Sequence, residues 1–226
     1  MHIKSDRLFT IHESDRSVTQ KMKNSLEECK MAKNTKQRIL DEALVMFAQR
    51  GYEGTNMREL AQALGLGKSA LYKHYASKED IWNSMLDALE AHYSEGFGSD
   101  DNLPAIPGTC GEFVEMSMQM VGFTMHDERI VLTRRLLLAE QHRDERAKAL
   151  ASEHFLNGLE RIFAHVFAGM MEKGLLKRCD PQLLALAYTA PISALIMERD
   201  RFPEREPEIA ERIRAFATRF VESCKE

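Results

Sequence analysis

Hydrophobic residues along this chain recur at helical spacing, and no stretch alternates with the two-residue period of a half-buried strand. One apolar stripe runs through residues 39–47 and stops before Gly51, and a second runs through residues 57–64 and stops before Gly65. Glycine ends helices readily because it tolerates the left-handed conformation of a helix C-terminus. The pattern therefore predicts an all-α protein.

The same period defines five longer helices in the second half of the chain. Asp180-Pro181 marks the start of one of them, because aspartate caps helices and proline is tolerated in a first turn. The sequence shows no internal repeat and no low-complexity tract. We expect these helices at residues 112–125, 127–141, 146–173, 181–199 and 206–223.

Residues 96–111, GFGSDDNLPAIPGTCG, have the composition of a loop, with four glycines and two prolines. We expect this linker to separate a helical domain at residues 34–95 from a second helical domain at residues 112–226. The second helix of the first domain begins after Thr55, whose hydroxyl is expected to cap it, and a further helix begins at Ser77.

Two short helical segments meet at a tight turn between Thr55 and Tyr75. After the turn, residues 67–75 commit one apolar side chain, Leu71, to the interior and leave basic, hydroxyl and aromatic side chains free. A short helix, a glycine-containing turn and a basic second helix together describe a helix-turn-helix, whose second helix enters the major groove of DNA.

With its flanks, this stretch closely resembles the DNA-binding domain of the TetR (tetracycline-repressor) family of bacterial transcriptional regulators. The resemblance covers about a fifth of the chain. One departure is Gly67, where the family usually has Ser or Thr, so capping is weaker and a hydroxyl that could meet phosphate is absent. The matching segments are TKQRILDEALVMF (35–47), Gly51-Tyr52, Thr55, RELA (58–61), LGL (64–66), LYKHY (71–75) and SKE (77–79).

Eight residues are candidates for contact with double-stranded DNA. The family resemblance implies phosphate contacts for Tyr72 and His74, while Ser69 and Ala70 are small enough to let the helix approach base edges. The alternative is that the aromatic residues only pack and the lysines are only solvated. The candidates are Thr55, Lys68, Ser69, Ala70, Tyr72, Lys73, His74 and Lys78.

Charge is distributed unevenly along the chain. The net charge is −4 and the isoelectric point about 6.1, yet residues 34–78 hold seven basic residues against four acidic ones. A locally basic module on an acidic body is typical of a DNA-binding domain joined to a domain with another role.

Residues 1–33 mix seven basic with five acidic residues and show no sustained apolar period, so we expect a disordered extension. The alternative is a basic arm that touches the minor groove of DNA. Because Met22 and Met31 lie just before the first domain, the translation start stays open among Met1, Met22 and Met31.

The second domain is rich in methionine and phenylalanine. Such residues at helical spacing usually form a core, but the TetR resemblance implies a pocket for a small-molecule effector between these helices. His165 is placed to orient a polar group of an effector. The candidate lining is Phe113, Met116, Met120, Phe123, Phe163, His165 and Phe167.

Residues 181–197 are apolar nearly all round, so both sides of this helix need burial. One monomer rarely covers both, and the family joins two such helices from each subunit into a four-helix interface. Pro191 lies inside the helix and is expected to kink it. The candidate interface of the homodimer is Leu184, Leu195, Phe216 and Phe220.

Other classes of function lack support in the sequence. The four cysteines include no CxxC pair, the histidines lack metal-ligand spacing, and no nucleophile–base constellation or phosphate-binding glycine loop is present. No apolar run approaches the roughly 18 residues that span a bilayer. We therefore expect a cytoplasmic protein without cofactor, metal or enzyme activity.

The sequence predicts a two-domain, homodimeric, effector-responsive transcriptional regulator, and we expect a repressor in preference to an activator. Its expected partners are a palindromic double-stranded DNA operator and an apolar small-molecule effector. The alternative is a ligand-independent helix-turn-helix protein that binds DNA or another protein.

Overall fold

The computed structural model describes residues 34–97 and 103–225, and within them the chain is helical without a strand, which confirms the predicted all-α fold. The extension predicted at residues 1–33 and part of the linker lie outside the described residues. A first helix covers residues 34–50, and the elements that follow are α2 (Met57–Ala63), α3 (Lys68–His74), α4 (Lys78–Phe97), α5 (Cys110–His126), α6 (Glu128–Glu140), α7 (Glu145–Ser152), a π-helical turn (Glu153–Asn157), α8 (Gly158–Glu172), α9 (Pro181–Arg201), a 3-10 turn (Pro203–Arg205) and α10 (Glu206–Ser223).

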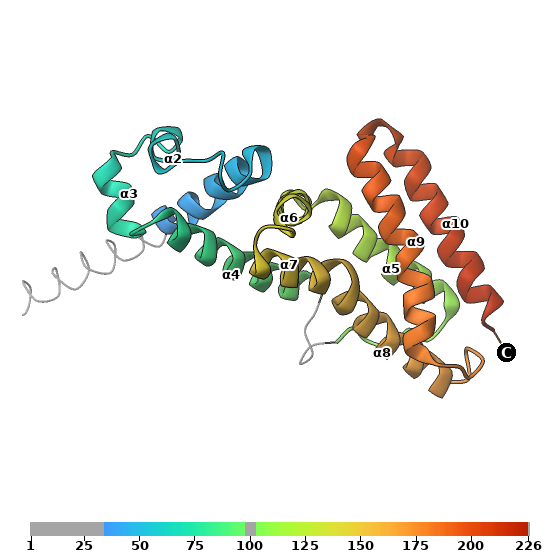
Figure 1. Ribbon diagram of the computed structural model, residues 1–226. Helices are drawn as coiled ribbons and strands as arrows, with labels where there is room; N and C mark the ends of the chain where they lie inside the picture. The colour runs from blue at the N-terminus through green and yellow to red at the C-terminus, as the bar shows by residue number, and fades with distance from the viewer. Residues whose placement is uncertain (1–33, 98–102, 226) are drawn as a thin grey trace, which may run out of the picture.

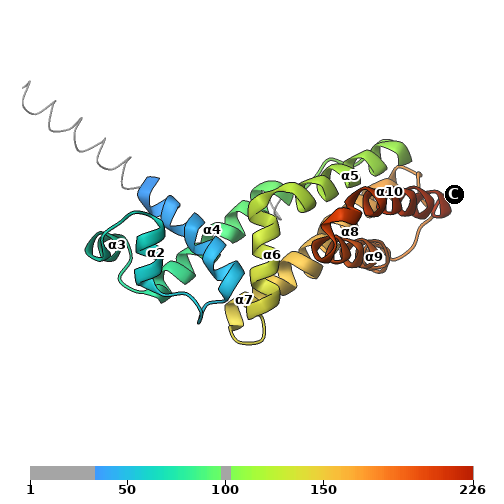
Figure 2. The same cartoon turned by 90° about the horizontal axis from the view of Figure 1, so that it is seen from above.

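The helices form two groups at opposite ends of an elongated molecule (Figure 1). The first helix, α2, α3 and the start of α4 make up one end, which we call the head. The remaining helices, α5 to α10, make up the body, and α6 and α7 are its helices nearest the head in both views (Figure 2). Within the body, α8 packs mainly against α9, and α10 packs against α5 and α9.

The start of α2 differs from the sequence prediction. Asn56 caps this helix, because its side-chain oxygen accepts hydrogen bonds from the amides of Arg58 (3.1 Å) and Glu59 (3.0 Å). The Thr55 hydroxyl instead donates to the carbonyl of Gly51, at 3.1 Å, and the residue is buried. The prediction that Thr55 caps α2 is therefore wrong, because the adjacent asparagine takes that role.

The turn between α2 and α3 follows the predicted geometry. Gly65 has a φ of +66°, the left-handed conformation that glycine adopts without strain. The amide of Leu66 donates to the carbonyl of Ala61 (2.8 Å), and the amide of Gly65 donates to Gln62 (3.0 Å), which is the hydrogen-bond pattern of a Schellman motif. Fully buried Leu71 then fixes α3 against the head.

The hydrophobic core of the head continues into the body. Leu136 and Leu137 of α6, together with Ala147 and Leu150 of α7, belong to the same buried cluster as the apolar stripe of the first helix. α4 extends to Phe97, two residues beyond the predicted end of the first domain. Head and body therefore share a packed core and do not meet only through the linker.

Polar contacts reinforce this junction. Glu140 is buried, and its Oε1 accepts a hydrogen bond from the amide of Tyr52 in the head, at 3.0 Å. Asp144 uses both carboxylate oxygens: Oδ1 caps α7 by accepting from the amide of Ala147 (2.7 Å), and Oδ2 accepts from the indole of Trp82 (3.3 Å). The end of α6 and the turn that follows it thus contact two head residues, Tyr52 and Trp82.

The segment predicted as one helix at residues 146–173 is helical throughout, but it is not a single α-helix. It consists of α7, the π-helical turn and α8. The other body helices follow the prediction closely: Asp180 caps α9, and α10 has both predicted ends. Periodicity alone does not reveal a π-turn, because an inserted residue only shifts the phase of the apolar stripe.

We expect Asp144→Ala to lower the free energy of unfolding by about 2 kcal/mol, because the change removes both a helix cap and the indole hydrogen bond. Urea unfolding followed by the fluorescence of Trp82, the single tryptophan, measures this. Glu145→Ala is the matched control, since the Glu145 side chain is 89% exposed. Equal stabilities of the two variants would contradict the role assigned to Asp144.

Candidate DNA interface and ligand pocket

Helix α3 lies at the far end of the head (Figure 1) and presents one polar face to solvent. Leu71 is fully buried, whereas Lys68, Ser69 and Lys73 are exposed and Tyr72 is 41% exposed. A helix of seven residues that buries one large side chain has most of its surface free. The predicted reading face is therefore present as a surface of α3.

Positive charge on this face is not neutralised internally. Within the described residues, neither Lys68 nor Lys73 forms an ion pair, and the Lys68 ammonium lies 5.7 Å from the centre of the Tyr72 ring. Ala70 and His74 are half-buried beside it. Gly67 caps α3 without a side-chain hydrogen bond, as predicted. The face combines free cations, a hydroxyl and an aromatic ring.

Two of the eight DNA candidates, Thr55 and Lys78, make contacts inside the head. The Lys78 ammonium donates to the carbonyls of Tyr52 (2.8 Å) and Thr55 (3.1 Å) and lies 4.0 Å from the centre of the Tyr52 ring. The Thr55 side chain is buried, with its hydroxyl directed at Gly51. The sequence indicated a surface contact for Lys78, because the hydrogen bonds of a lysine to backbone carbonyls far away in the chain cannot be predicted from neighbouring residues.

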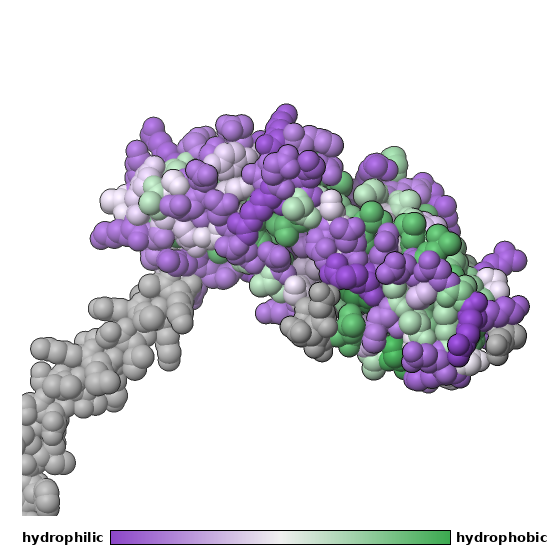
Figure 3. Space-filling model, turned by 60° about the horizontal axis from the view of Figure 1, so that its bottom comes forward, coloured by the Kyte–Doolittle hydropathy of each residue, from purple (hydrophilic) through white to green (hydrophobic). Residues whose placement is uncertain are grey.

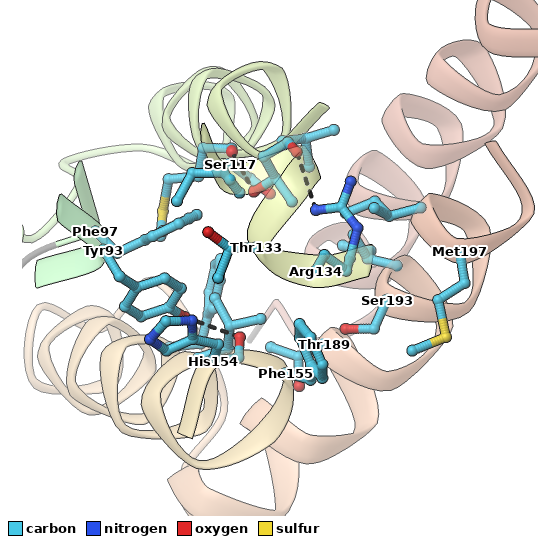
Figure 4. Close-up of a pocket in the computed structure, with 18 residues that line it drawn as sticks. Tyr93, Phe97, Ser117, Thr133, Arg134, His154, Phe155, Thr189, Ser193 and Met197 are labelled. Atoms are coloured by element: carbon cyan, nitrogen blue, oxygen red, sulfur yellow. Dashed lines mark hydrogen bonds between the residues drawn. The ribbon is translucent and has the colours of Figure 1, made fainter. Parts of the chain in front are cut away.

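A cavity with about 70 Å³ of free volume lies inside the body, between α4, α5, α6, α8 and α9 (Figure 4). Most of its wall is apolar, with a few polar side chains among the aliphatic and aromatic ones. The lining residues are Tyr93, Phe97, Ser117, Met120, Val121, Thr124, Ile130, Thr133, Arg134, His154, Phe155, Leu159, Phe163, Thr189, Ile192, Ser193, Ile196 and Met197.

Of the seven residues predicted to line a pocket, Met120 and Phe163 do so. Phe113 and Phe167 are fully buried in an aromatic core, and Met116 packs against it. The other two, Phe123 and His165, also lie outside the lining. The methionine- and phenylalanine-rich helices are therefore largely core, which was the alternative interpretation of the sequence.

A buried ion pair forms one side of the cavity. The Arg134 side chain is 5% exposed, and its Nε and Nη2 donate to the two carboxylate oxygens of Asp200, at 2.5 and 2.9 Å. Its Nη1 donates to the carbonyl of Thr124, at 3.1 Å. This pair is not evident in the sequence, because its members are 66 positions apart.

His154 forms part of the opposite side. It lies in the π-helical turn, stacks on Tyr93 with the ring centres 3.8 Å apart, and is 5% exposed. Its Nε2 is buried without a hydrogen-bond partner, and burial lowers the pKa of the imidazole to about 4. The ring is therefore uncharged at neutral pH. The π-helical turn marks this histidine in the structure, but no residue pattern in the sequence predicts such a turn.

The hydroxyl groups of the threonines in the wall already donate hydrogen bonds within the protein. The hydroxyl groups of Thr124, Thr133 and Thr189 each donate to a carbonyl one turn earlier in their own helix, at 2.7 to 2.9 Å. A hydroxyl that donates in this way has only lone pairs left. These three threonines thus offer only acceptors to the cavity.

Comparisons with known proteins address the identity of the chain. The family model described as "Bacterial regulatory proteins, tetR family" matches residues 39–85, which include α2, the turn and α3. A TetR-family regulator from Mesorhizobium loti has the same fold, with a TM-score of 0.63 and 21% identity over 86% of this chain and 98% of that one. The chain belongs to the TetR family of transcriptional regulators. Members of this family are not enzymes.

Curated relatives of this TetR-family chain include named repressors. The biofilm operon negative regulator IcaR of Staphylococcus epidermidis is 23% identical over 151 residues, or 54% of this chain and 76% of that protein. The transcriptional repressor KstR2 of Rhodococcus jostii is 30% identical over 146 residues. That alignment spans 60% of this chain and 63% of the repressor, which is less than two thirds of its length.

A second solved structure, the flavonoid-responsive regulator FrrA, aligns with a TM-score of 0.58 and 20% identity over 85% of this TetR-family chain and 97% of FrrA. At this identity the likeness concerns the fold. In the described part of the chain, no helix is long and apolar enough to cross a membrane. The same residues contain no group of three or more His, Cys, Asp or Glu that could hold a metal ion.

We expect Lys78→Met to lower the free energy of unfolding by about 2 kcal/mol, because two charge-assisted hydrogen bonds to backbone carbonyls are lost while the apolar stem is kept. Urea unfolding measures the change. Lys73→Met, on the exposed face of α3, should stay within about 0.5 kcal/mol of the unsubstituted protein. A destabilising Lys73→Met beside a neutral Lys78→Met would reverse the two assignments.

Proposed function

We propose that this TetR-family chain is a homodimeric repressor that binds a palindromic double-stranded DNA operator through α3 and is released by a small apolar effector in the body cavity. The observation that carries the proposal is the free basic and aromatic face of α3 beside buried Leu71. The repressor role rests on the similarity to IcaR, a negative regulator, and to KstR2, a repressor. A regulator of this kind acts in the cytoplasm, where bacterial DNA lies.

The DNA contacts come from six residues of α3. Lys73 and Tyr72 reach phosphates, because they are long and exposed, whereas Ser69 and Ala70 let the helix approach base edges closely. Thr55 and Lys78 act indirectly by holding the head together. The proposed contact set is Lys68, Ser69, Ala70, Tyr72, Lys73 and His74.

A dimer is supported by an apolar stripe on the outside of α9. Leu183 is 64% exposed and Leu186 is 40% exposed, and exposed alanines continue the stripe along the helix at positions 187, 190 and 194. Hydrophobic residues gather on the body, whereas the head is mainly hydrophilic (Figure 3). Soluble monomers rarely expose large continuous apolar patches, so a second copy is the proposed cover.

The four residues first expected at the interface are half-buried. Leu184 and Leu195 are half-buried against the core of their own chain. Phe216 and Phe220 are half-buried too, with ring centres 5.9 and 5.1 Å from that of Tyr188. We propose that they support the dimer face from within and that the exposed leucines make the contact.

An effector must enlarge the cavity in order to bind. The free volume of about 70 Å³ is well below the roughly 300–1,000 Å³ of typical ligand pockets. α6 lines the cavity through Thr133 and Arg134, and its last residue, Glu140, holds Tyr52 of the head. α4 lines it through Tyr93 and belongs to the head at its other end.

A ligand that parts these helices therefore changes the position of the head. Release of DNA requires that the effector bind the displaced arrangement better than the DNA-competent one. A coupling free energy of about 1–3 kcal/mol corresponds to roughly 5- to 150-fold weaker DNA binding. We propose that α4 and α6 transmit this change together.

We expect salt-sensitive binding to an inverted repeat upstream of the chain's own gene, since two basic heads on a symmetric dimer need two half-sites. Lys73→Ala should weaken binding to all sequences alike, whereas Lys68→Ala and Ser69→Val should change the preferred base. Affinity over a salt series, on this DNA and on shuffled DNA, measures both effects. Indifference to salt and sequence would reject the DNA-reading role.

We expect Leu186→Glu to shift the protein toward monomer at micromolar concentration, because it places a charge in the proposed dimer face. Leu138→Glu on α6 is the matched control, since Leu138 has nearly the same exposure, 37% against 40%, and should leave the dimer intact. Sedimentation velocity measures both. A monomeric unsubstituted protein at that concentration would refute the dimer.

A further inference from the structure

We propose that the body cavity selects an uncharged, mostly apolar molecule that carries a hydroxyl group, and that His154 recognises this hydroxyl. This inference rests on the proposed function, since it names the class of effector for the same cavity. Four features of the wall support it. They are the unpaired Nε2 of His154, the ion pair that neutralises Arg134, the threonine hydroxyls that already donate to backbone carbonyls, and the apolar character of the remaining wall.

The first feature is the unpaired Nε2 of His154. Buried polar atoms almost always have a hydrogen-bond partner, because leaving one unpaired costs its full desolvation free energy. The residue lies in a π-helical turn. Such turns are rare in proteins overall, and many of those that occur lie at functional sites. A ligand atom that pairs with Nε2 would remove this cost, so the unpaired atom favours a polar group on the ligand.

The ring is held in place for such a contact. It stacks on Tyr93 with an interplanar angle of 4°, and the Tyr93 hydroxyl donates to the carbonyl of His154 itself, at 2.9 Å. Figure 4 shows both side chains on one side of the cavity, with Arg134 across from them. A fixed ring presents its nitrogen without an entropic cost at the moment of binding.

The second feature is the absence of free positive charge in the described wall. Arg134 is neutralised by the two-bond contact with Asp200, and His154 is uncharged at neutral pH. A carboxylate ligand would bring a buried charge without a counter-ion. The wall therefore disfavours anions and favours a neutral polar group.

The third feature decides which neutral group fits. The hydroxyls of Thr133 and Thr189 offer acceptors only, because their protons go to backbone carbonyls. A ligand carbonyl or ether can accept a hydrogen bond from Nε2–H of His154 in one tautomer or from the Ser193 hydroxyl, but it cannot pair with these threonine oxygens. A ligand hydroxyl can donate to these oxygens and can pair with Nε2 in either tautomer of the histidine. The remaining wall is aliphatic and aromatic, which suits an apolar skeleton.

Three probes on one skeleton test this: naphthalene, 2-naphthol and 2-naphthoate, titrated into the full chain by calorimetry. We expect 2-naphthol to bind at least tenfold more tightly than naphthalene, and 2-naphthoate more weakly than either. His154→Phe keeps the ring stacked on Tyr93 but removes Nε2, so 2-naphthol should fall to the affinity of naphthalene while naphthalene changes less than threefold. His165→Phe, outside the cavity wall, is the control and should leave all three affinities unchanged.

Two further measurements separate recognition from a structural role. The melting temperature of His154→Phe should equal or exceed that of the unsubstituted protein, because an unpaired polar atom is removed. NMR of ¹⁵N-histidine-labelled protein should show one imidazole Nε2 resonance that moves with 2-naphthol and not with naphthalene, and that is missing in His154→Phe. A large fall in melting temperature, or no such resonance, would mark His154 as structural and overturn the inference.

The outcomes distinguish this inference from the proposed function. Equal binding of 2-naphthol and naphthalene, or a preference that survives His154→Phe, overturns the hydroxyl recognition and leaves the cavity as a ligand site. Tight 2-naphthol binding that leaves affinity for the upstream DNA unchanged supports the recognition and overturns the effector role. If no probe binds up to its solubility limit, both the inference and the proposed effector site fail.

Discussion

The end of α6 and the turn after it pack against the head and join the two parts of the molecule. Buried Glu140 receives the amide of Tyr52, and Asp144 receives the indole of Trp82, within a hydrophobic core that both parts share. These tertiary contacts hold the head in its position against the body. Packed side chains therefore connect the body helices to the part of the molecule that carries α3, which is the route that the proposed effector mechanism uses.

The fold was largely predictable because its information is local. Apolar spacing located the helices, Asp180 and Ser77 marked starts, and Gly65 marked the turn. Where prediction failed, neighbours of similar chemistry competed: Thr55 and Asn56 can each cap a helix, but the Thr55 hydroxyl donates to the Gly51 carbonyl four residues earlier and Asn56 caps α2. The family resemblance supplied the identity of the head, which covers a small part of the chain, and said little about the walls of the cavity.

The cavity was harder to predict because its wall is made by residues from five helices. Whether Phe113 or Phe163 lines it depends on a small rotation of each helix, which no periodicity resolves. The polar groups that shape its chemistry, Arg134 and His154, looked like an ordinary basic residue and an ordinary histidine in the sequence. Their chemistry depends on residues far away in the chain. Arg134 pairs with Asp200. His154 is buried among residues that exclude water and offer its Nε2 no hydrogen bond.

The π-helical turn also sets a rule for how this protein can diverge. An α-helix rotates by about 100° per residue, so the extra residue between α7 and α8 turns the face that α7 packs on the head relative to the face that α8 packs on α9. Losing one residue here would straighten the helix but swing one of these faces toward solvent. Substitutions in this stretch leave both packing faces in place, whereas insertions and deletions do not. Descendants of this gene should therefore keep the length of the segment more strictly than its composition.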